Sequence, residues 1–171
     1  MKKWIYENDK ENTVRYVLGE IEEPNIDDNK TMACIGINPS FAEPNKLDNT
    51  VNFVKKKIIK ENYDNWIMFN IYPKRSTIFN KLENDKDIII FVKNIEIIIY
   101  WIKTLNIKNL WCAWGSLIKK RKYLFESLEY IIDKIEQNKY INNIKFLRAD
   151  YKISEKNHPH HRLYLPKESK L

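Results

Sequence analysis

Residues 32–50, MACIGINPSFAEPNKLDNT, decide the fold and contain the first candidate site. The uncharged run at 32–36 is typical of a buried strand, and the polar residues after it are typical of a loop that leaves the edge of a sheet. Gly36 allows another backbone or a ligand to come close. Pro39 fixes its own φ angle and biases Asn38 away from helix. The sequence therefore predicts a strand and a loop that positions the Asn38 amide, although a plain Asn-Pro turn would give the same local pattern.

The composition indicates one basic domain. The chain has 171 residues, a length at which a single domain buries roughly two thirds of its unfolded surface, so we expect one domain over residues 1–171. It has 30 Lys and Arg against 23 Asp and Glu, which gives a formal net charge of +7 at pH 7. A basic chain rich in aromatic residues fits a polyanionic partner, although a high content of Lys, Asn and Ile also follows from the base composition of a genome.

The cysteines indicate the compartment. Cys34 and Cys112 each lie in an apolar run typical of a strand. This placement favours reduced core residues in a cytoplasmic protein over a disulfide or a metal site. The N-terminus lacks the apolar core of a signal peptide, and the most hydrophobic stretch, residues 95–102, is too short to cross a bilayer. We therefore expect a cytoplasmic monomer that does not enter a membrane.

Strands and helices alternate along the chain. Apolar runs predict a short strand or extended segment at 14–18 and four strands at 31–37, 66–71, 109–114 and 144–149. Helical periodicity predicts helices at 50–62, at 90–105 and from Ser116, as its cap, to about Asn138. Such alternation implies parallel strands joined by right-handed crossovers. We therefore predict an α/β fold, a three-layer α/β/α sandwich with a mainly parallel four-stranded central sheet.

The candidate site residues fall at one edge of this predicted sheet. Ligands of open α/β sheets bind beyond the C-terminal ends of the strands. The loops expected there cover residues 38–50, 70–77, 115–116 and 150–162. Charged and amide groups that several loops bring to one edge suit recognition of a polar planar ligand. The candidates are Asn38, Ser40, Phe41, Asp48, Asn70, Arg75, His160 and His161.

Other kinds of site have less support. The histidines at 158, 160 and 161 have no HxxEH or Cys/His pairing beside them, so we expect a surface turn or a donor set and no metal. Gly115-Ser116 lacks the first half of a nucleophile elbow. GxxxxGK[ST] and GxGxxG are both absent, and we expect no cofactor. The basic run at 119–122 is either a solvated helix face or, because it lies one turn past the site edge, a phosphate contact.

The order of the motifs resembles a bacterial and phage family of proteins of unknown function. That family has Asn-Pro-Ser-x-Ala, Asp-x-Thr, a central strand ending in Asn, a Trp-Gly pair and a terminal Pro-x-His-Pro-Leu-Tyr-Leu. The resemblance spans nearly the whole chain through Arg15-Tyr16, Asn38-Pro39-Ser40, Asp48 with Thr50, Asn70 before Arg75, Ala113-Trp114-Gly115, and Pro159-His160-His161 before Leu163-Tyr164-Leu165. Arg162 stands where the pattern has its second proline, so the last loop departs from the pattern.

More distantly, the same order is similar to the uracil-DNA glycosylase superfamily. Gly-Ile-Asn-Pro at 36–39 resembles the motif of the mismatch-specific branch, in which the Asn positions the attacking water. Asn70 resembles the Asn that reads the base, and His161 resembles the histidine of the His-Pro-Ser loop. The cysteine count excludes the iron-sulfur branch. The resemblance implies a uracil-DNA glycosylase-like fold and a monofunctional DNA glycosylase that removes a damaged or modified base, including a modified base of phage DNA.

The resemblance also implies a role for each candidate. Cleavage of an N-glycosidic bond passes through an oxocarbenium-like sugar, which needs a placed water, a polar or negative group near the sugar and a donor for the departing base. Asn38 and Asp48 would supply the first two, and His161 the third. The flipped-out base would be bound by Phe41, Asn70 and Ser40. DNA phosphates would be held by Arg75, Lys119, Lys120, Arg121 and Arg162, with Leu163 as a wedge.

Two other functions remain open from the sequence. A protein can keep a glycosylase-like fold and bind nucleic acid without hydrolysing it, since fold does not guarantee function. The same pocket would also suit an enzyme that acts on free nucleosides or nucleotides. Only a glycosylase leaves an alkali-labile abasic site in DNA, and this difference separates the three functions.

Overall fold

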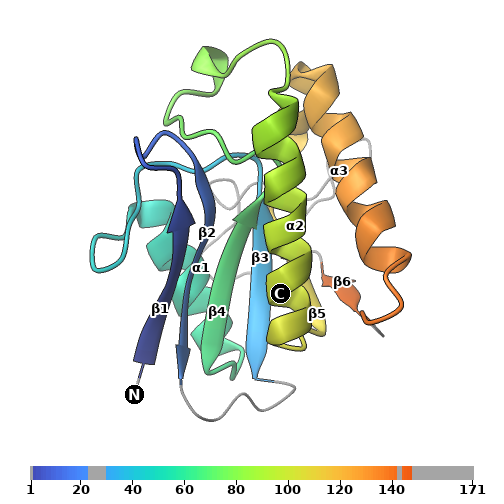
Figure 1. The fold of residues 1–171 in the computed structure, drawn as a ribbon. Coiled ribbons are helices and arrows are strands. Elements are labelled where there is room, and N and C mark those ends of the chain that lie inside the picture. The colour runs from blue at the N-terminus through green and yellow to red at the C-terminus, as the bar shows by residue number, and fades with distance from the viewer. Residues whose placement is uncertain (1, 23–29, 142–143, 148–171) are drawn as a thin grey trace.

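The computed structural model describes residues 2–22, 30–141 and 144–147 (Figure 1). In this part of the chain, six strands form one sheet in the order β1-β2-β4-β3-β5-β6. The strands are β1 (Lys2–Asn8), β2 (Arg15–Glu22), β3 (Thr31–Gly36), β4 (Asn65–Asn70), β5 (Asn109–Cys112) and β6 (Lys145–Leu147). The helices are α1 (Asn49–Lys60), α2 (Ile88–Thr104) and α3 (Lys122–Glu136), with short 3-10 helices η1 (Phe79–Lys81) and η2 (Ser116–Lys120).

The four strands predicted from apolar runs are present and parallel. β3 pairs in parallel with β4 and β5, and β5 pairs in parallel with β6. All six residues of β3 and all six of β4 are buried, because helices cover both faces of the sheet. Strands of this kind are apolar throughout rather than alternating, which is why their sequences predicted them.

The sheet is larger than the predicted four strands, and it is mixed. β1 pairs antiparallel with β2, and β2 pairs antiparallel with β4, where Leu18 lies opposite Met68. Of these two strands the sequence predicted only residues 14–18. In β1 the only buried residue is Ile5, as expected of an edge strand whose other side chains meet solvent. The result is a six-stranded sheet in which only β2 runs against the other strands.

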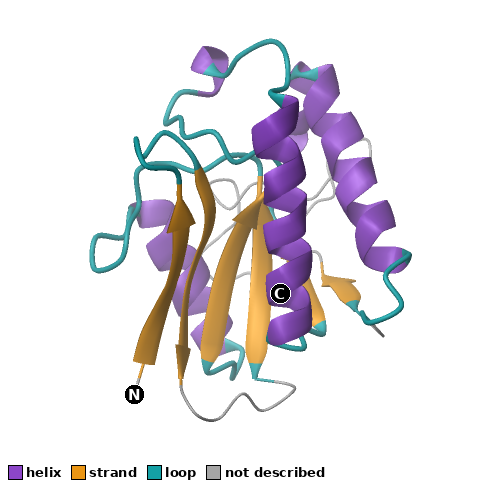
Figure 2. Cartoon of the chain, in the orientation of Figure 1, coloured by secondary structure: helices purple, strands orange, loops and turns teal. Residues whose placement is uncertain are grey.

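Helices cover both faces of the sheet (Figure 2). The chain passes from β3 to β4 in one direction, and then from β4 past β3 to β5 and β6 in the other. Right-handed crossovers in opposite directions place their helices on opposite faces. Accordingly, α1 packs on one face, whereas α2 and α3 pack on the other.

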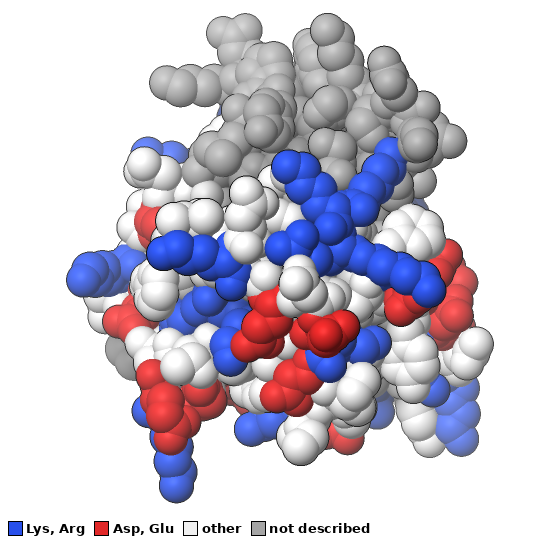
Figure 3. All heavy atoms as spheres, turned by 90° about the horizontal axis from the view of Figure 1, so that it is seen from above, with Lys and Arg blue, Asp and Glu red and all other residues white. Residues whose placement is uncertain are grey.

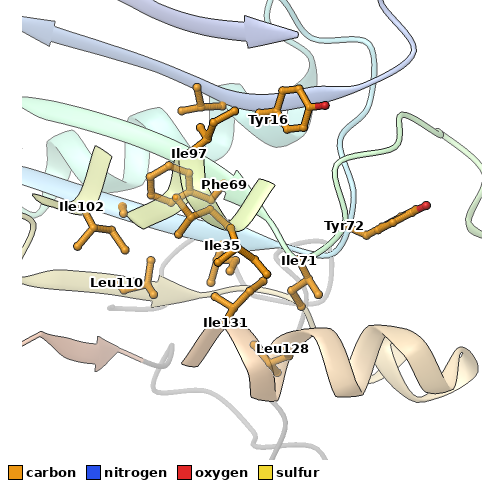
Figure 4. Packing of buried hydrophobic residues seen from close by; sticks show 14 of the residues in the cluster. Tyr16, Ile35, Phe69, Ile71, Tyr72, Ile97, Ile102, Leu110, Leu128 and Ile131 are labelled. Carbon is orange, nitrogen blue, oxygen red and sulfur yellow. The ribbon is translucent and has the colours of Figure 1, made fainter. Parts of the chain in front are cut away.

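Two hydrophobic cores result from this arrangement. Figure 4 shows part of the core beneath α2 and α3, where Ile35 and Phe69 of the sheet lie among residues such as Ile131. On the other face, the core beneath α1 contains Cys34 and Met68. Neighbouring residues of β3 point to opposite faces, as the pleat of a strand requires. Cys34 and Cys112 are both buried, in line with the core role expected for them.

Two helix starts can be compared with prediction. Asp87 caps α2, since its carboxylate accepts a hydrogen bond from the backbone N–H of Ile89 at 2.9 Å, so the helix begins at Ile88 and not at residue 90 as predicted. The helix expected to follow Ser116 directly does not do so. Gly115 has φ 64°, the left-handed region that favours glycine, and it leads into η2, so α3 begins only at Lys122. No helix among the described residues has the length and apolar character needed to cross a membrane.

Candidate functional site

A pocket of about 380 Å³ lies at the C-terminal edge of the parallel strands. The loop after β3 leads to α1 on one face, whereas the loops after its neighbours β4 and β5 lead to the other face. Adjacent strands whose loops separate in this way leave a crevice in which α/β proteins bind ligands. The pocket is lined by residues of all three loops, by the start of α1 and by the first residue of β2.

Four predicted site residues line this pocket together. They are Asn38, Ser40 and Asp48 from the segment between β3 and α1, and Asn70 from the end of β4. Phe41 and Arg75 are not among the lining residues. The predicted residues His160, His161, Arg162 and Leu163 lie outside the described part of the chain.

Asn38 lies near the beginning of the loop after β3, where hydrogen bonds fix its side chain. Its Nδ2 donates to the carbonyl oxygen of Ser76 at 2.8 Å and, at 3.3 Å, to that of Pro39. The Ser76 backbone N–H in turn donates to the Pro39 carbonyl at 2.8 Å, which joins the two loops. Because the amide nitrogen is used in this way, Oδ1 is the atom that Asn38 can offer to a water molecule in the pocket.

Asp48 is fixed at the beginning of α1. One carboxylate oxygen accepts a hydrogen bond from the Val51 backbone N–H at 2.7 Å and caps the helix. The other accepts a hydrogen bond from the Ser40 hydroxyl. A carboxylate is favourable at a helix N-terminus because it meets free N–H groups and the positive end of the helix dipole. The structure therefore provides a negative charge on the pocket wall whose position does not depend on a ligand.

Arg15 is a site residue that the sequence analysis missed. It begins β2, and because β2 runs against its neighbours, the start of this strand lies at the edge where they end. The side chain is 1% exposed and lines the pocket. Its Nη1 donates to the Ala42 carbonyl at 3.1 Å and its Nη2 to Oδ1 of Asn70 at 3.4 Å, whereas Nε has no partner. The signal in the sequence was the motif Arg15-Tyr16, which had no assigned role.

The charge of Arg15 is poorly compensated. Burial lowers the pKa of its guanidinium to about 10, and the nearby positive charge of Arg75 acts in the same direction. Asp48 opposes this shift of the pKa, but no carboxylate of the described residues forms an ion pair with Arg15. A buried cation without an ion-pair partner is costly, and an electron-rich ligand would relieve that cost.

Asn70, the last residue of β4, carries an unused donor. Its side chain is 1% exposed, its Oδ1 accepts from Arg15, and its Nδ2 has no partner. A Cβ atom added to Gly36 would lie 3.1 Å from this Nδ2. Both residues line the pocket, so the missing side chain of Gly36 leaves space beside the free N–H groups. From behind, Asn94 of α2 donates to the Asn70 carbonyl at 2.9 Å and holds the end of the strand.

Arg75 and Phe41 do not occupy their predicted roles. Arg75 is buried, and its guanidinium bonds within the protein. Its Nη1 donates to the Ser40 carbonyl at 2.7 Å and its Nη2 to the Tyr6 hydroxyl at 2.6 Å. The guanidinium also lies over the Phe41 ring, 5.9 Å from its centroid. Phe41 is 60% exposed and outside the pocket. Arg75 therefore braces the loop after β3 instead of presenting a free cation to phosphate, and Phe41 is not placed to stack on a ligand in the pocket.

Basic side chains gather on the side of the molecule toward which the parallel strands point (Figure 3). Lys119 and Lys120 are exposed on η2, the same short helix that carries Leu117 of the pocket lining. Arg121 differs from them, because its Nη2 donates to the Leu82 carbonyl at 3.4 Å and its guanidinium lies 5.6 Å from the Phe79 ring centroid. Lys119 and Lys120 are thus available to a polyanion, whereas Arg121 is already used within the protein.

The residues of the pocket suit hydrogen bonding to a polar ligand better than coordination of a metal ion. Within residues 2–22, 30–141 and 144–147, no three His, Cys, Asp or Glu side chains come together in a way that could hold a metal ion. The pocket instead combines three amides, four Ser or Thr residues, one carboxylate and one guanidinium. Such groups bind polar planar ligands through directional hydrogen bonds.

Comparison with known proteins identifies the family of the chain. No curated protein matches the chain. A family described as a protein of unknown function (DUF1643) matches residues 15–163, which begin at the buried arginine and include three of the pocket loops. This range covers most of the sequence and all the predicted site residues. The chain therefore belongs to the DUF1643 family.

Proposed function

We propose that this protein is a DNA glycosylase that hydrolyses the N-glycosidic bond of a damaged or modified base, including a modified base of phage DNA. The observation that supports it is the convergence of Asn38, Asp48 and Asn70 in one pocket at the sheet edge. The glycosylase resemblance implies a different role for each of these three residues. The mainly parallel sheet with helices on both faces is compatible with a uracil-DNA glycosylase-like fold.

The proposed reaction uses water as the nucleophile. Oδ1 of Asn38 accepts a hydrogen bond from the water and aims it at C1′ of the sugar. The C1′–N bond breaks, its electron pair leaves with the base, and a C1′–O bond forms with the water, whose proton ends on the departing base. Asp48, held by Ser40 and the start of α1, stabilises the positive charge that develops on the sugar.

The base occupies the floor of the pocket beside Asn70 and Arg15. A volume of about 380 Å³ is near the lower end of the range for small-molecule sites. It accommodates one base rather than a duplex, so the nucleotide must be flipped out of the helix. In this proposal His161 donates to the departing base, Leu163 fills the gap in the duplex, and Arg162, Lys119 and Lys120 contact phosphates. The protein acts on DNA as a cytoplasmic monomer, in repair or in defence against phage.

The test is release of a base from defined DNA. Duplexes and single strands that contain uracil, hypoxanthine or hypermodified phage bases are incubated with the protein and then treated with alkali. Strand cleavage at the modified position is expected, and it should disappear in the double variant Asn38→Ala/Asp48→Asn. The matched control Asn80→Ala changes an exposed Asn outside the pocket and should cleave like wild type. If the wild type releases no base from any substrate, the glycosylase proposal fails.

A second candidate is an enzyme that acts on free nucleosides or nucleotides. The observation in its favour is that the hydrogen-bonding groups of the pocket floor, on Arg15 and Asn70, require only a base and not a polymer. Chromatography of nucleosides incubated with the protein distinguishes it, because free base would appear without DNA. DNA binding without release of any base would instead indicate a non-catalytic binding protein on the same fold.

A further inference from the structure

The floor of the pocket, formed by Arg15 and Asn70, has hydrogen-bond donors without a partner. Among the described residues that line the pocket, two buried polar side-chain atoms have no hydrogen-bond partner. They are Nε of Arg15 and Nδ2 of Asn70, and both are donors. A buried donor without a partner costs free energy, which a ligand acceptor would recover.

The acceptors nearby are already used. Oδ1 of Asn70 accepts from Arg15, and the Ala42 carbonyl accepts from both Arg15, at 3.1 Å, and Arg75, at 3.4 Å. The carboxylate of Asp48 accepts from Ser40 and from the start of α1. A ligand that reaches the floor therefore finds N–H groups and positive charge, with no equivalent set of buried free acceptors among the described lining residues.

Nucleobases differ in whether they have two neighbouring acceptors on one edge. Guanine and hypoxanthine have O6 beside N7, and cytosine has O2 beside N3. Adenine has an amino donor beside N7, so it lacks this pair. Uracil and thymine have an N3–H donor between their two carbonyl oxygens. A floor of donors thus favours 6-oxopurines and cytosines over uracil and adenine.

We infer that the pocket floor selects a base edge with two neighbouring acceptors, through Asn70 and Arg15. The inference rests on the proposed function only in that a base occupies this pocket. According to this inference uracil is not the preferred base, because Asn70 offers its Nδ2 donor to the ligand while its Oδ1 accepts from Arg15. The 6-oxopurines and the cytosines share this chemistry, and a binding experiment separates them.

The experiment measures binding of deoxynucleosides to the wild-type protein by calorimetry. Deoxyguanosine is compared with its 7-deaza analogue, which lacks the N7 acceptor, and deoxycytidine with its 3-deaza analogue, which lacks the N3 acceptor. Deoxyuridine and deoxyadenosine carry the disfavoured edges. One parent should bind at least about tenfold tighter than its deaza analogue and than the two disfavoured nucleosides, in line with the discrimination of bidentate base contacts. The parent that does so identifies the source of the acceptor pair.

A variant tests the same point through the protein. Asn70→Asp replaces the free Nδ2 donor with an acceptor, and its carboxylate still accepts from Arg15 as an ion pair. We expect binding of the preferred nucleoside to weaken about tenfold or more and no fall in the melting temperature, because the buried guanidinium gains a counter-charge. Asn80→Asp, at an exposed position outside the pocket, is the matched control and should bind like wild type.

The outcomes distinguish this inference from the proposed function. Equal binding of parent and deaza analogues, preference for deoxyuridine or deoxyadenosine, or no binding of any nucleoside would overturn the inference. Base release from uracil-containing DNA together with any of these results would leave the glycosylase proposal standing. Selective binding without release of any base would support the acceptor-pair floor and remove the hydrolytic step.

Discussion

Nη2 of Arg15 lies 3.4 Å from Oδ1 of Asn70, and the contact joins the first residue of β2 to the last residue of β4. Both side chains are buried and form the pocket floor. The amide oxygen of Asn70 therefore faces the guanidinium, and the amide nitrogen is the end left free. The orientation of this base-reading candidate is set by the protein before any ligand arrives.

Two glycine substitutions should affect different properties, one the binding of a ligand and the other the stability of the fold. Gly36→Ala puts a Cβ atom 3.1 Å from Nδ2 of Asn70 and 3.2 Å from Cε of Met68, which are side-chain atoms that can shift. Gly19→Ala puts a Cβ atom 2.7 Å from the backbone oxygen of Trp66, which cannot. We expect Gly36→Ala to weaken nucleoside binding about tenfold or more with little change in stability, since it fills the pocket floor. Gly19→Ala should lower the free energy of unfolding by about 1–3 kcal/mol.

Urea denaturation and calorimetry on both glycine variants check this prediction. Binding that is unaffected by Gly36→Ala would place the ligand elsewhere in the pocket. Equal reductions of stability in the two variants would mean that Gly36 is required by the fold and not by the ligand.

Substitutions of Asp48 should separate its two roles. Asn also caps helices well, so Asp48→Asn should keep most of the stability, whereas Asp48→Ala should lower the free energy of unfolding by about 1 kcal/mol. Both variants lose the negative charge that the proposed mechanism places beside the sugar, so both should release base about 10²-fold more slowly. Thermal melts and single-turnover rates measure the two effects. Full activity of Asp48→Asn would show that the carboxylate serves only the helix.

Asn38→Ala should reduce base release while sparing DNA binding. In the proposed mechanism, the water that Oδ1 positions contributes mainly in the transition state, so a reduction of about 10²-fold in the single-turnover rate is expected. Fluorescence anisotropy with labelled DNA measures binding in parallel, and Asn80→Ala is the control. A parallel fall in binding and rate would indicate that Asn38 supports the loop, through its bond to the Ser76 carbonyl, more than it supports the chemistry.

The basic residues after Gly115 should separate into two groups. Lys119→Ala/Lys120→Ala should flatten the dependence of DNA affinity on salt, with the slope falling by about 0.9 for each phosphate that the variant no longer neutralises. Arg121→Ala should instead destabilise the fold, because its guanidinium bonds the Leu82 carbonyl. Lys56→Ala/Lys60→Ala removes two exposed lysines of α1 and is the charge-matched control. An unchanged slope for the first pair would assign it to a solvated surface.

Tyr123 should govern part of the alkaline stability. Burial raises the pKa of its phenol from 10.0 to about 12, and the nearby Tyr72 adds to the effect. Between these values the unfolded chain has lost the proton and the folded protein keeps it, so the free energy of unfolding falls as the pH rises from about 10 to 12. Tyr123→Phe removes this contribution.

We therefore expect the variant to lose less stability than the wild type over that pH range. At neutral pH it should be at least as stable, because the Tyr123 hydroxyl is buried and has no hydrogen-bond partner in the described structure. Urea midpoints at several alkaline pH values measure this, with Tyr100→Phe, at an exposed position, as the control. Parallel stability curves for Tyr123→Phe and the wild type would contradict it.

The extent to which sequence predicted the fold depended on burial. β3 and β4 are apolar on both faces because helices cover both, and such runs are conspicuous in a sequence. β1 could not be predicted in the same way, since in KKWIYEN only Ile5 is buried. Its pairing with β2 is a tertiary contact that the polar composition of this edge strand does not indicate.

The lining of the candidate pocket was predictable where polar residues directly follow a parallel strand, as at Asn38 and Asn70. Arg15 is the first residue of its strand, and only the antiparallel direction of β2 brings it to the same edge, which no local pattern reveals. Arg75 was predicted to contact DNA phosphates, and an arginine in a loop is ordinarily exposed. The carbonyl groups of the loop after β3 and the hydroxyl of Tyr6, brought close by tertiary folding, satisfy it instead.

The strand order also has a consequence for synthesis on the ribosome. β1 and β2 emerge first, but the inner edge of β2 pairs with β4, so it stays open until Asn65–Asn70 has left the exit tunnel. β3 emerges earlier than both of its neighbours in the sheet, β4 and β5. The nascent chain therefore carries an exposed hairpin edge and then a bare central strand, and the wall of the pocket closes only after Ala113 and Leu117 have been added.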